Sequence, residues 1–314
     1  MTTYLNWKDK KLDGKTYDVA IIGAGIAGLT AAIYARRAHK SVIVFEQRTH
    51  GGQIIQTFHI ENWPGEECIS GVDLMNNVFK QTEKLRANFE YLDIQKIEKD
   101  GDLWKLSSDD YWYKARSIII ATGSNEKKLD IPGEEKFISR GVSYCATCDG
   151  AFYHDKTVAV VGGGNTAFYD ALYLADICKK VYLIHRRNEF RADEHLVEKV
   201  QKKKNVEFLT PFAPQEILGD KKVNQLKIAS RDGEERLLEV DGVFVAVGRT
   251  PSTSTFDGLV DLDEGGYIKA GEDCKTSTPS IYVAGDVRTK EVRQLVTAAA
   301  DGAVAATEAV RNLS

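Results

Sequence analysis

The chain has 314 residues, 43% hydrophobic and 28% charged, which is the composition of an ordinary folded protein with room for two domains. The net charge of -4 at pH 7 does not favour nucleic acid as a partner, and no apolar run is long enough for a membrane span. Because the first residues lack the apolar region of a secretion signal, we expect a cytoplasmic protein with no membrane partner.

The first patterned region predicts a strand over 17–22, a helix from about 26 to 40 and a strand over 41–46. Between the first strand and the helix lies GAGIAG at residues 23–28, a dinucleotide-binding fingerprint. Its glycines allow a tight turn and a close approach of the backbone to a pyrophosphate. Glu46 ends the second strand, where a carboxylate binds a free ribose 2′-hydroxyl, so this site is predicted to take FAD or NAD.

Two stretches are predicted to be linkers, 121–125 after an apolar strand over 117–120, and 248–252 after a strand over 242–247. The stretch after the second linker is too short to form a domain alone. We therefore predict an α/β protein in which residues 1–124 and 251–314 form one Rossmann-like domain. Residues 125–250 form a second such domain inserted into it, and the two adjacent crossings can act as a hinge.

Five cysteines are present, as the pair Cys145 and Cys148 and three singles, Cys68, Cys178 and Cys274, which are expected to be structural. A zinc site would need two further ligands, but the chain has no second Cys-x-x-Cys and no matching histidine pair, so no metal is predicted. The pair instead indicates a redox-active dithiol in a reducing compartment. Asp149 is a candidate general acid and base, although Asp149-Gly150 is also typical of a simple turn.

A second dinucleotide unit comes after the dithiol, with a strand over 158–161, a helix around 167–178 and a strand over 181–185. Its fingerprint is GGGNTA at residues 162–167. His185 stands at the same offset from this fingerprint as Glu46 from the first, and three arginines come after it: Arg186, Arg187 and Arg191. Guanidinium groups suit the 2′-phosphate of NADP, so we favour an NADP site over a solvated basic loop.

Further motifs are GGQ at residues 51–53, ENWPG at 61–65, ATG at 121–123, GDV at 285–287 and RQ at 293–294. Together with the two fingerprints, CATCD at 145–149 and the arginines, this ordered set resembles the low-molecular-weight, bacterial-type thioredoxin reductases over essentially the whole chain. The resemblance implies an FAD-containing homodimer in which NADPH reduces the flavin, the flavin reduces the disulfide, and the dithiol reduces thioredoxin or a thioredoxin-like protein.

By position, the resemblance implies that Cys148 faces the flavin, Cys145 attacks the partner's disulfide and Asp149 donates a proton. Asp286 resembles the residue that holds the ribityl and phosphate region of FAD, although it also fits a helix N-cap. The implied FAD positions are Gly23, Gly25, Ala27, Gly28, Glu46, Gly52, Gln53, Asn62, Thr122, Gly123, Gly285, Asp286, Arg293, Gln294 and Leu295. The implied NADPH positions are Gly163, Gly164, Asn165, Thr166, His185, Arg186, Arg187 and Arg191.

One departure from the family pattern is Phe168-Tyr169-Asp170, whose two aromatic side chains we interpret as core packing, with crowding of the nicotinamide as the alternative. Other readings of the chain keep the flavin and dithiol but take electrons from a donor such as ferredoxin, or make it a dithiol oxidase that uses oxygen. A redox-sensing or binding module without catalysis is a further alternative. The intact arginines argue against the ferredoxin donor.

Overall fold

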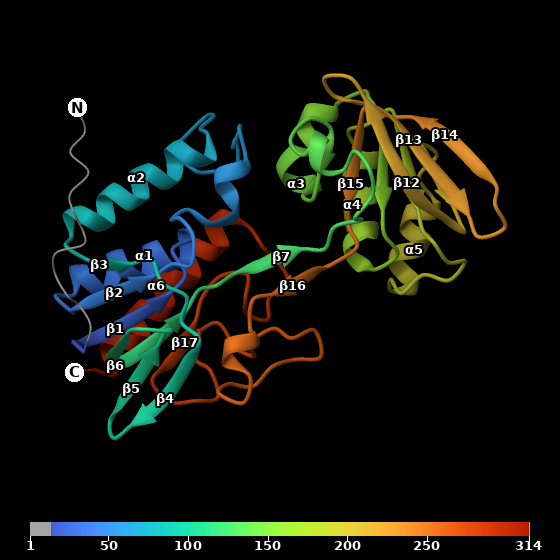
Figure 1. Ribbon diagram of the computed structural model, residues 1–314. Coiled ribbons are helices and arrows are strands. Elements are labelled where there is room, and N and C mark those ends of the chain that lie inside the picture. The colour runs from blue at the N-terminus through green and yellow to red at the C-terminus, as the bar shows by residue number, and fades with distance from the viewer. Residues whose placement is uncertain (1–13, 314) are drawn as a thin grey trace. The chain divides into compact units, whose positions relative to one another are not determined.

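The computed structural model describes residues 14–313, which divide into two compact units (Figure 1). The first comprises the chain up to Asn125 and from Thr250 onward, and the second is Glu126–Arg249. The chain passes between them in β7 (Ser124–Glu126) and β16 (Arg249–Pro251), which pair as a two-stranded sheet. The stretches predicted as linkers overlap these two strands.

The first unit is built on a seven-stranded sheet with strand order β3-β2-β1-β6-β5-β4 and β17 also paired with β6. The strands β1, β2, β3, β6 and β17 run parallel, and β4 and β5 add an antiparallel hairpin. The strands are β1 (Thr16–Ile22), β2 (Val42–Phe45), β3 (Asn88–Glu90), β4 (Lys96–Asp100), β5 (Leu103–Ser107), β6 (Trp112–Ile120) and β17 (Ile281–Val283). The helices are α1 (Ile26–Arg37), α2 (Gly71–Lys84) and α6 (Leu295–Arg311), with short 3-10 turns η2 (Gly52–Gln56) and η5 (Ser254–Phe256).

The central strands β1 and β2 are buried on both faces of the sheet, which explains the continuously apolar runs at 19–22 and 42–45. In β1, Val19 and Ile21 belong to the hydrophobic cluster that contains α1 and α6, whereas Ala20 and Ile22 belong to the cluster on the other face. The predicted first strand, helix and second strand are all present. The helix ends at Arg37, before the predicted end at residue 40, because His39 turns into the left-handed region with φ of 59°.

The inserted unit carries a five-stranded parallel sheet with strand order β11-β10-β9-β15-β8, and a separate antiparallel sheet β12-β13-β14 that the sequence analysis did not predict. The strands are β8 (Val142–Ser143), β9 (Thr157–Val161), β10 (Lys180–Ile184), β11 (Val206–Leu209), β12 (Phe212–Gly219), β13 (Val223–Ser230), β14 (Glu235–Glu239) and β15 (Gly242–Val245). The helices are α3 (Ala146–Asp149), α4 (Asn165–Ala175) and α5 (Glu194–Gln201), with 3-10 turns η3 (Glu135–Phe137) and η4 (Gly150–Tyr153). The predicted helix around 167–178 thus begins and ends earlier than expected, and the strand predicted to reach residue 247 stops at Val245.

Glycines set how closely the helices of the first unit approach their neighbours. A Cβ added to Gly28 would lie 1.9 Å from the carbonyl oxygen of Gly23, and one added to Gly302 in α6 would lie 2.2 Å from the carbonyl oxygen of Ala27 in α1. Helices α1 and α6 therefore lie in contact through backbone as well as side chains. Among the helices within residues 14–313, none combines the length and apolar character required to cross a bilayer.

We predict that Gly302→Ala lowers the thermal stability of the protein, because the new methyl group must push α6 away from α1. Overpacking of this kind typically costs about 1–3 kcal/mol. The melting temperature measured by differential scanning calorimetry should fall by several degrees. Gly271→Ala is the matched control, since its Cβ would meet only Asp273 Oδ1 at 3.6 Å. Equal melting temperatures for the two variants would contradict this account of the helix contact.

Candidate active site

The first fingerprint forms the turn between β1 and α1. Gly23 has a φ of 108°, and its backbone packs so closely on the next loop that an added Cβ would lie 2.3 Å from the Ala121 carbonyl oxygen. Gly25 is the N-cap of α1, and no atom lies within 4 Å of a Cβ built there. No side chain caps α1, and the open position at Gly25 lets a ligand approach the start of the helix, which is the arrangement that receives a pyrophosphate.

Glu46 comes directly after β2, and its carboxylate lies at this turn. One oxygen accepts a hydrogen bond from the Ala24 N–H at 2.9 Å, and the other accepts one from the Arg48 N–H at 3.0 Å. The Gly51 N–H donates to the Ala24 carbonyl oxygen at 2.8 Å, which brings the start of η2 to the same turn. The predicted ribose ligand and the Gly51-Gly52-Gln53 motif are thus adjacent to the glycines, although they are far from them in sequence.

The predicted positions at 122–123 and 285–286 lie in loops at the carboxyl ends of the parallel strands β6 and β17. The Ala121 N–H donates to the Ile22 carbonyl oxygen and the Ala284 N–H to that of Ile120, so the chain ends of three neighbouring strands meet here. Gly285 has a φ of 80°, and its added Cβ would lie 3.0 Å from Ala27 Cβ. Thr122 Oγ1 donates to the Ser252 carbonyl oxygen at 2.8 Å. This edge of the sheet is where ligands bind in open α/β folds.

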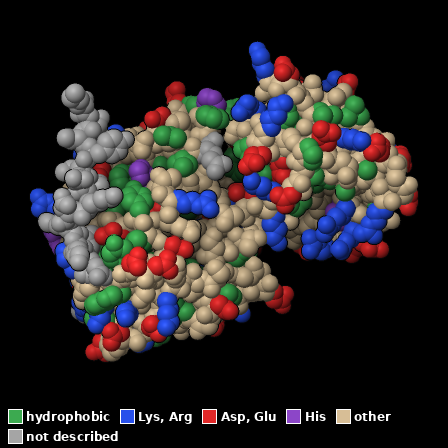
Figure 2. Space-filling model, in the orientation of Figure 1, with side chains coloured by type: hydrophobic (Ala, Val, Ile, Leu, Met, Phe, Trp, Pro, Cys, Tyr) green, Lys and Arg blue, Asp and Glu red, His purple; other side chains and the backbone are tan. Residues whose placement is uncertain are grey.

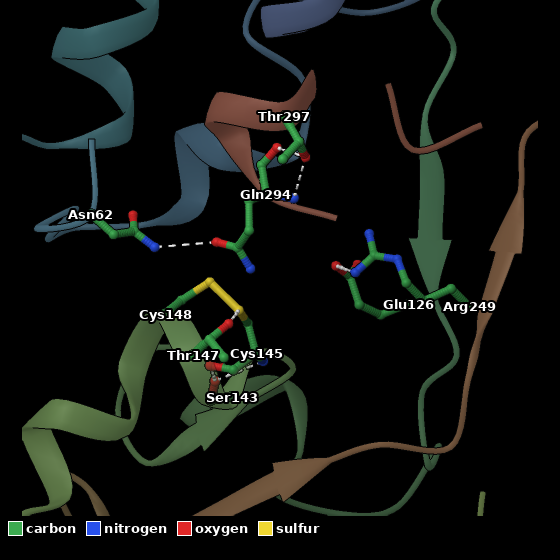
Figure 3. The surroundings of a disulfide bond; sticks show 9 residues. All are labelled: Asn62, Glu126, Ser143, Cys145, Thr147, Cys148, Arg249, Gln294 and Thr297. Atoms are coloured by element: carbon green, nitrogen blue, oxygen red, sulfur yellow. Dashed lines mark hydrogen bonds and ion pairs between the residues drawn. A yellow bond between two sulfur atoms is a disulfide. The ribbon is translucent and has the colours of Figure 1, made fainter. Parts of the chain in front are cut away.

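Asn62 and Gln294 lie side by side in the first unit. Asn62 Nδ2 donates to Gln294 Oε1 at 3.2 Å, and Gln294 precedes Leu295, the first residue of α6 (Figure 3). The Gln294 N–H donates to Thr297 Oγ1 at 3.1 Å, which fixes the start of α6. Asp286 lies in the turn after β17, and in the described chain the next helix, α6, begins only at Leu295. The alternative of a helix cap for Asp286 is therefore wrong.

Sequence reasoning missed a buried charge cluster that holds the 285–294 loop. Asp301 in α6 accepts from Arg288 Nε and Nη2, both at 2.9 Å, from Lys290 Nζ at 2.7 Å and from the Gly285 N–H at 3.0 Å. Burial acts to raise the pKa of Asp301, but these two cations hold it below its ordinary value. The signal available in the sequence was one aspartate among small residues of a helix, Ala298 to Ala306.

The second fingerprint forms the corresponding turn between β9 and α4. Gly164 is the N-cap of α4, and again no atom lies within 4 Å of a Cβ built there. Gly163 lies against His185, because its added Cβ would be 2.3 Å from the imidazole ring. His185 is buried and also contacts Phe190, with ring centroids 5.6 Å apart. Burial and the neighbouring arginines lower its pKa, which favours the uncharged form of the ring.

The three arginines predicted to bind NADP, Arg186, Arg187 and Arg191, are exposed, as a phosphate-binding set must be. Figure 2 shows Lys and Arg side chains gathered over the region that Figure 1 labels α5. Two residues of the fingerprint contact the chain that carries these arginines. The Arg191 N–H donates to the Gly163 carbonyl oxygen at 2.8 Å, and the Asn165 amide bonds to Asp193. Thr166 is exposed in the first turn of α4.

Cys145 and Cys148 form a disulfide at the short helix α3 of the second unit (Figure 3). Cys145 is half-buried and Cys148 is exposed. The Cys145 N–H donates to Ser143 Oγ at 3.1 Å, and Thr147 Oγ1 lies 3.5 Å from Cys145 Sγ. Burial raises the pKa of Asp149, against the effect of a hydrogen bond with the Ser143 hydroxyl. A carboxyl group that keeps its proton more readily than usual is suited to proton transfer beside thiols.

The remaining sequence predictions concern Asp149-Gly150, the single cysteines and Phe168. Asp149 ends α3 and Gly150 begins η4, so the two residues join two short helical turns. Cys178 and Cys274 are buried free thiols, as expected for structural cysteines, whereas Cys68 is exposed. Phe168 is fully buried and packs on Phe190 and Phe208, with ring centroids 4.9 and 6.2 Å apart, so the interpretation as core packing is confirmed for this residue. It is wrong for Tyr169, whose side chain is exposed on the surface of α4.

Comparison with known proteins agrees with these features. Residues 17–302 match the pyridine nucleotide-disulphide oxidoreductase family. The chain is 43% identical over 293 residues to a thioredoxin reductase of Listeria innocua, covering 93% of this chain and 92% of that protein, and 40% identical to one of Bacillus subtilis, covering 93% of each. The crystal structure of thioredoxin reductase from Streptococcus pyogenes is similar with a TM-score of 0.90 and 41% identity, covering 95% of this chain and 98% of that one.

The chain belongs to the thioredoxin reductase family. It is an oxidoreductase whose cofactors are FAD and NADPH, and the predicted α/β fold with two Rossmann-like units is confirmed. The residues present fit two dinucleotides, since each unit leaves the space above an N-cap glycine open and has, after its second strand, the side chains suited to one ribose. The carboxylate of Glu46 suits a free 2′-hydroxyl, and the arginines suit a 2′-phosphate.

Asp170, the last residue of the departure from the family pattern, gives a pH-dependent prediction. Burial raises its pKa to about 7, whereas an unfolded aspartate has a pKa of about 3.9. Between these values the folded state binds more protons than the unfolded state, so this residue lowers stability as pH rises. We therefore expect Asp170→Asn to raise the melting temperature above that of the parent protein, and to raise it more at pH 8 than at pH 5. The exposed Asp232→Asn is the control, and an unchanged difference at the two pH values would contradict the prediction.

Proposed function

We propose that this protein is a thioredoxin reductase in which electrons pass from NADPH through FAD to the Cys145–Cys148 disulfide and then to thioredoxin or a thioredoxin-like protein. FAD, when bound, accepts a hydride from the nicotinamide and delivers two electrons to the disulfide. The observation that carries the proposal is the Cys145–Cys148 disulfide. In this member of the thioredoxin reductase family, it lies in the same unit as the second fingerprint and the three arginines. A ferredoxin donor or an oxygen-using oxidase is not favoured, because the arginines are present and exposed.

The proposed partner reduction uses three residues of the inserted unit. The Cys145 thiolate attacks the partner disulfide, which forms a mixed disulfide and releases one partner thiolate. The Cys148 thiolate then attacks the Cys145 sulfur, which re-forms the Cys145–Cys148 disulfide and releases the second partner thiolate. Two electrons pass to the partner, and Asp149, whose pKa is raised by burial, supplies a proton to a leaving thiolate.

The cofactors are assigned to the two units by their second strands. We propose that the first unit holds FAD through the turn at Gly23–Gly28, Glu46 and the loops at 51–53, 121–123 and 285–295. The second unit then holds NADPH through the turn at 162–166 and the arginines. The boundaries at 124/125 and 250/251 remain our proposal for the two domains. We further propose a cytoplasmic homodimer, with β7 and β16 as the hinge; Arg249 Nη1 and Glu126 Oε1 form an ion pair at 2.8 Å at the ends of these strands (Figure 3).

Cys145→Ser tests the route of the electrons. Without this thiol, turnover with thioredoxin should fall by at least about a thousandfold, as for other removed nucleophiles. Anaerobic bleaching of the flavin band by NADPH should persist in a stopped-flow experiment, because that step does not need Cys145. Cys68→Ser removes an exposed free thiol and serves as the control. Full turnover in Cys145→Ser would overturn the assigned path.

Arg186→Ala combined with Arg187→Ala tests the nucleotide. Loss of two charge-assisted contacts to a 2′-phosphate should raise KM for NADPH by about a hundredfold or more, at roughly 1.5–3 kcal/mol each. The KM for NADH should change little, because NADH has no 2′-phosphate. Steady-state reduction of thioredoxin with each nucleotide makes the comparison. An equal loss with both would remove the reason for assigning NADPH to this unit.

A further inference from the structure

The glycine turn and the arginine loop of the inserted unit are joined by three hydrogen bonds. The Arg191 N–H donates to the Gly163 carbonyl oxygen at 2.8 Å. Asn165 Nδ2 donates to Asp193 Oδ2 at 3.0 Å, and the Asp193 N–H donates to Asn165 Oδ1 at 2.8 Å. We call the reciprocal pair of bonds between Asn165 and Asp193 the clasp. It joins the first residue of α4 to the residue that precedes α5.

Asp193 occupies an N-cap position but does not act as a cap. An aspartate before a helix ordinarily accepts a hydrogen bond from an N–H of its own first turn. At α5 no such side-chain bond is formed, and the carboxylate instead binds the amide of Asn165 at the start of the neighbouring helix. The amide of Asn165 in turn directs both its oxygen and its nitrogen to Asp193. The Asp193 carboxylate therefore links the N-terminus of α5 to that of α4, in place of capping α5.

The two segments joined by the clasp carry the two phosphate-binding elements assigned above. Asn165 is next to Gly164, which leaves the N-terminus of α4 open. Asp193 lies two residues after Arg191, the last of the three exposed arginines. The spacing of the two elements must match the fixed distance between the pyrophosphate and the 2′-phosphate of one nucleotide. A segment that is already held at this spacing loses less conformational entropy when the nucleotide binds.

We propose that Asp193 is a positioning residue that holds the arginine loop at the spacing required by a 2′-phosphorylated dinucleotide, and that Asn165 acts through it. This inference rests on the proposed NADPH site. Asp193 touches neither phosphate in this account. Its negative charge by itself works against an anion nearby, so removal of the charge and removal of the clasp are expected to have opposite effects on binding.

The experiment measures dissociation constants by calorimetry for two ligands of the flavin-loaded enzyme. NADP⁺ spans the turn and the arginines, whereas adenosine 2′-phosphate reaches only the arginines. Asp193→Ala removes the acceptor of the clasp together with the charge. Compared with Asp193→Asn, which removes the charge alone, it should bind NADP⁺ about tenfold more weakly, as for the loss of one hydrogen bond to a charged group. Binding of adenosine 2′-phosphate should change by less than about threefold, since it does not depend on the spacing.

Two variants separate the clasp from the charge. Asp193→Asn removes the charge but keeps an oxygen that accepts from Asn165, so NADP⁺ should bind at least as tightly as to the parent enzyme. Glu194→Gln removes the adjacent exposed charge and is the matched control. If Asp193→Ala binds NADP⁺ as well as Asp193→Asn does, or weakens both ligands equally, the clasp has no positioning role and the inference fails.

Arg186→Ala with Arg187→Ala is measured in parallel. This variant should weaken both NADP⁺ and adenosine 2′-phosphate, whatever Asp193 does. If it weakens neither, the NADPH site is wrong and the inference is overturned with it. If it weakens both while Asp193→Ala and Asp193→Asn bind NADP⁺ equally well, only the positioning role of Asp193 is overturned.

Discussion

The contact on which the rest of the structure depends is the close approach of each glycine turn to the backbone around it. In the first unit this approach is closer than any side chain permits, since a Cβ on Gly28 would lie 1.9 Å from the Gly23 carbonyl oxygen. In the second unit, a Cβ on Gly162 would lie 2.4 Å from the carbonyl oxygen of Ala246. Each helix can then begin directly at the carboxyl edge of its sheet, with no side chain capping its N-terminus. Both proposed nucleotide sites depend on this constraint.

A second constraint acts on the segment that returns to the first unit after the insertion. The loop between β17 and α6 has little apolar content to fix it, and Asp301 holds it at three points through Gly285, Arg288 and Lys290. A buried carboxylate is costly unless it is fully paired, and here two cations and a backbone N–H provide that pairing. The flavin-binding positions proposed at 285–295 therefore depend on a charge that lies six residues after the start of α6.

Local pattern was enough to predict the two βαβ units, because apolar periodicity and glycine spacing are properties of neighbouring residues. It did not predict the antiparallel sheet β12-β13-β14, whose strands are only partly buried and lack a continuous apolar run. The roles of His185 and Asn165 were also beyond it. His185 packs on Gly163, and Asn165 bonds to Asp193, and both contacts join residues that are distant in sequence. The spacing of residues along the sequence can assign a residue to a site, but it does not show which distant residue its side chain contacts.

The distribution of the chemistry between the units bears on how the enzyme works. The disulfide and the proposed NADPH site both belong to the inserted unit, whereas the proposed FAD site belongs to the other. In the proposed relay, FAD held by the first unit would exchange electrons with two parts of the inserted unit, the nicotinamide site and the disulfide. One fixed arrangement of the two units would allow both electron transfers only if the nicotinamide and the disulfide could contact the flavin at the same time. Because the chain passes between the units only in β7 and β16, alternate presentation of the two needs bending in just these strands, which is why we assign the hinge to them.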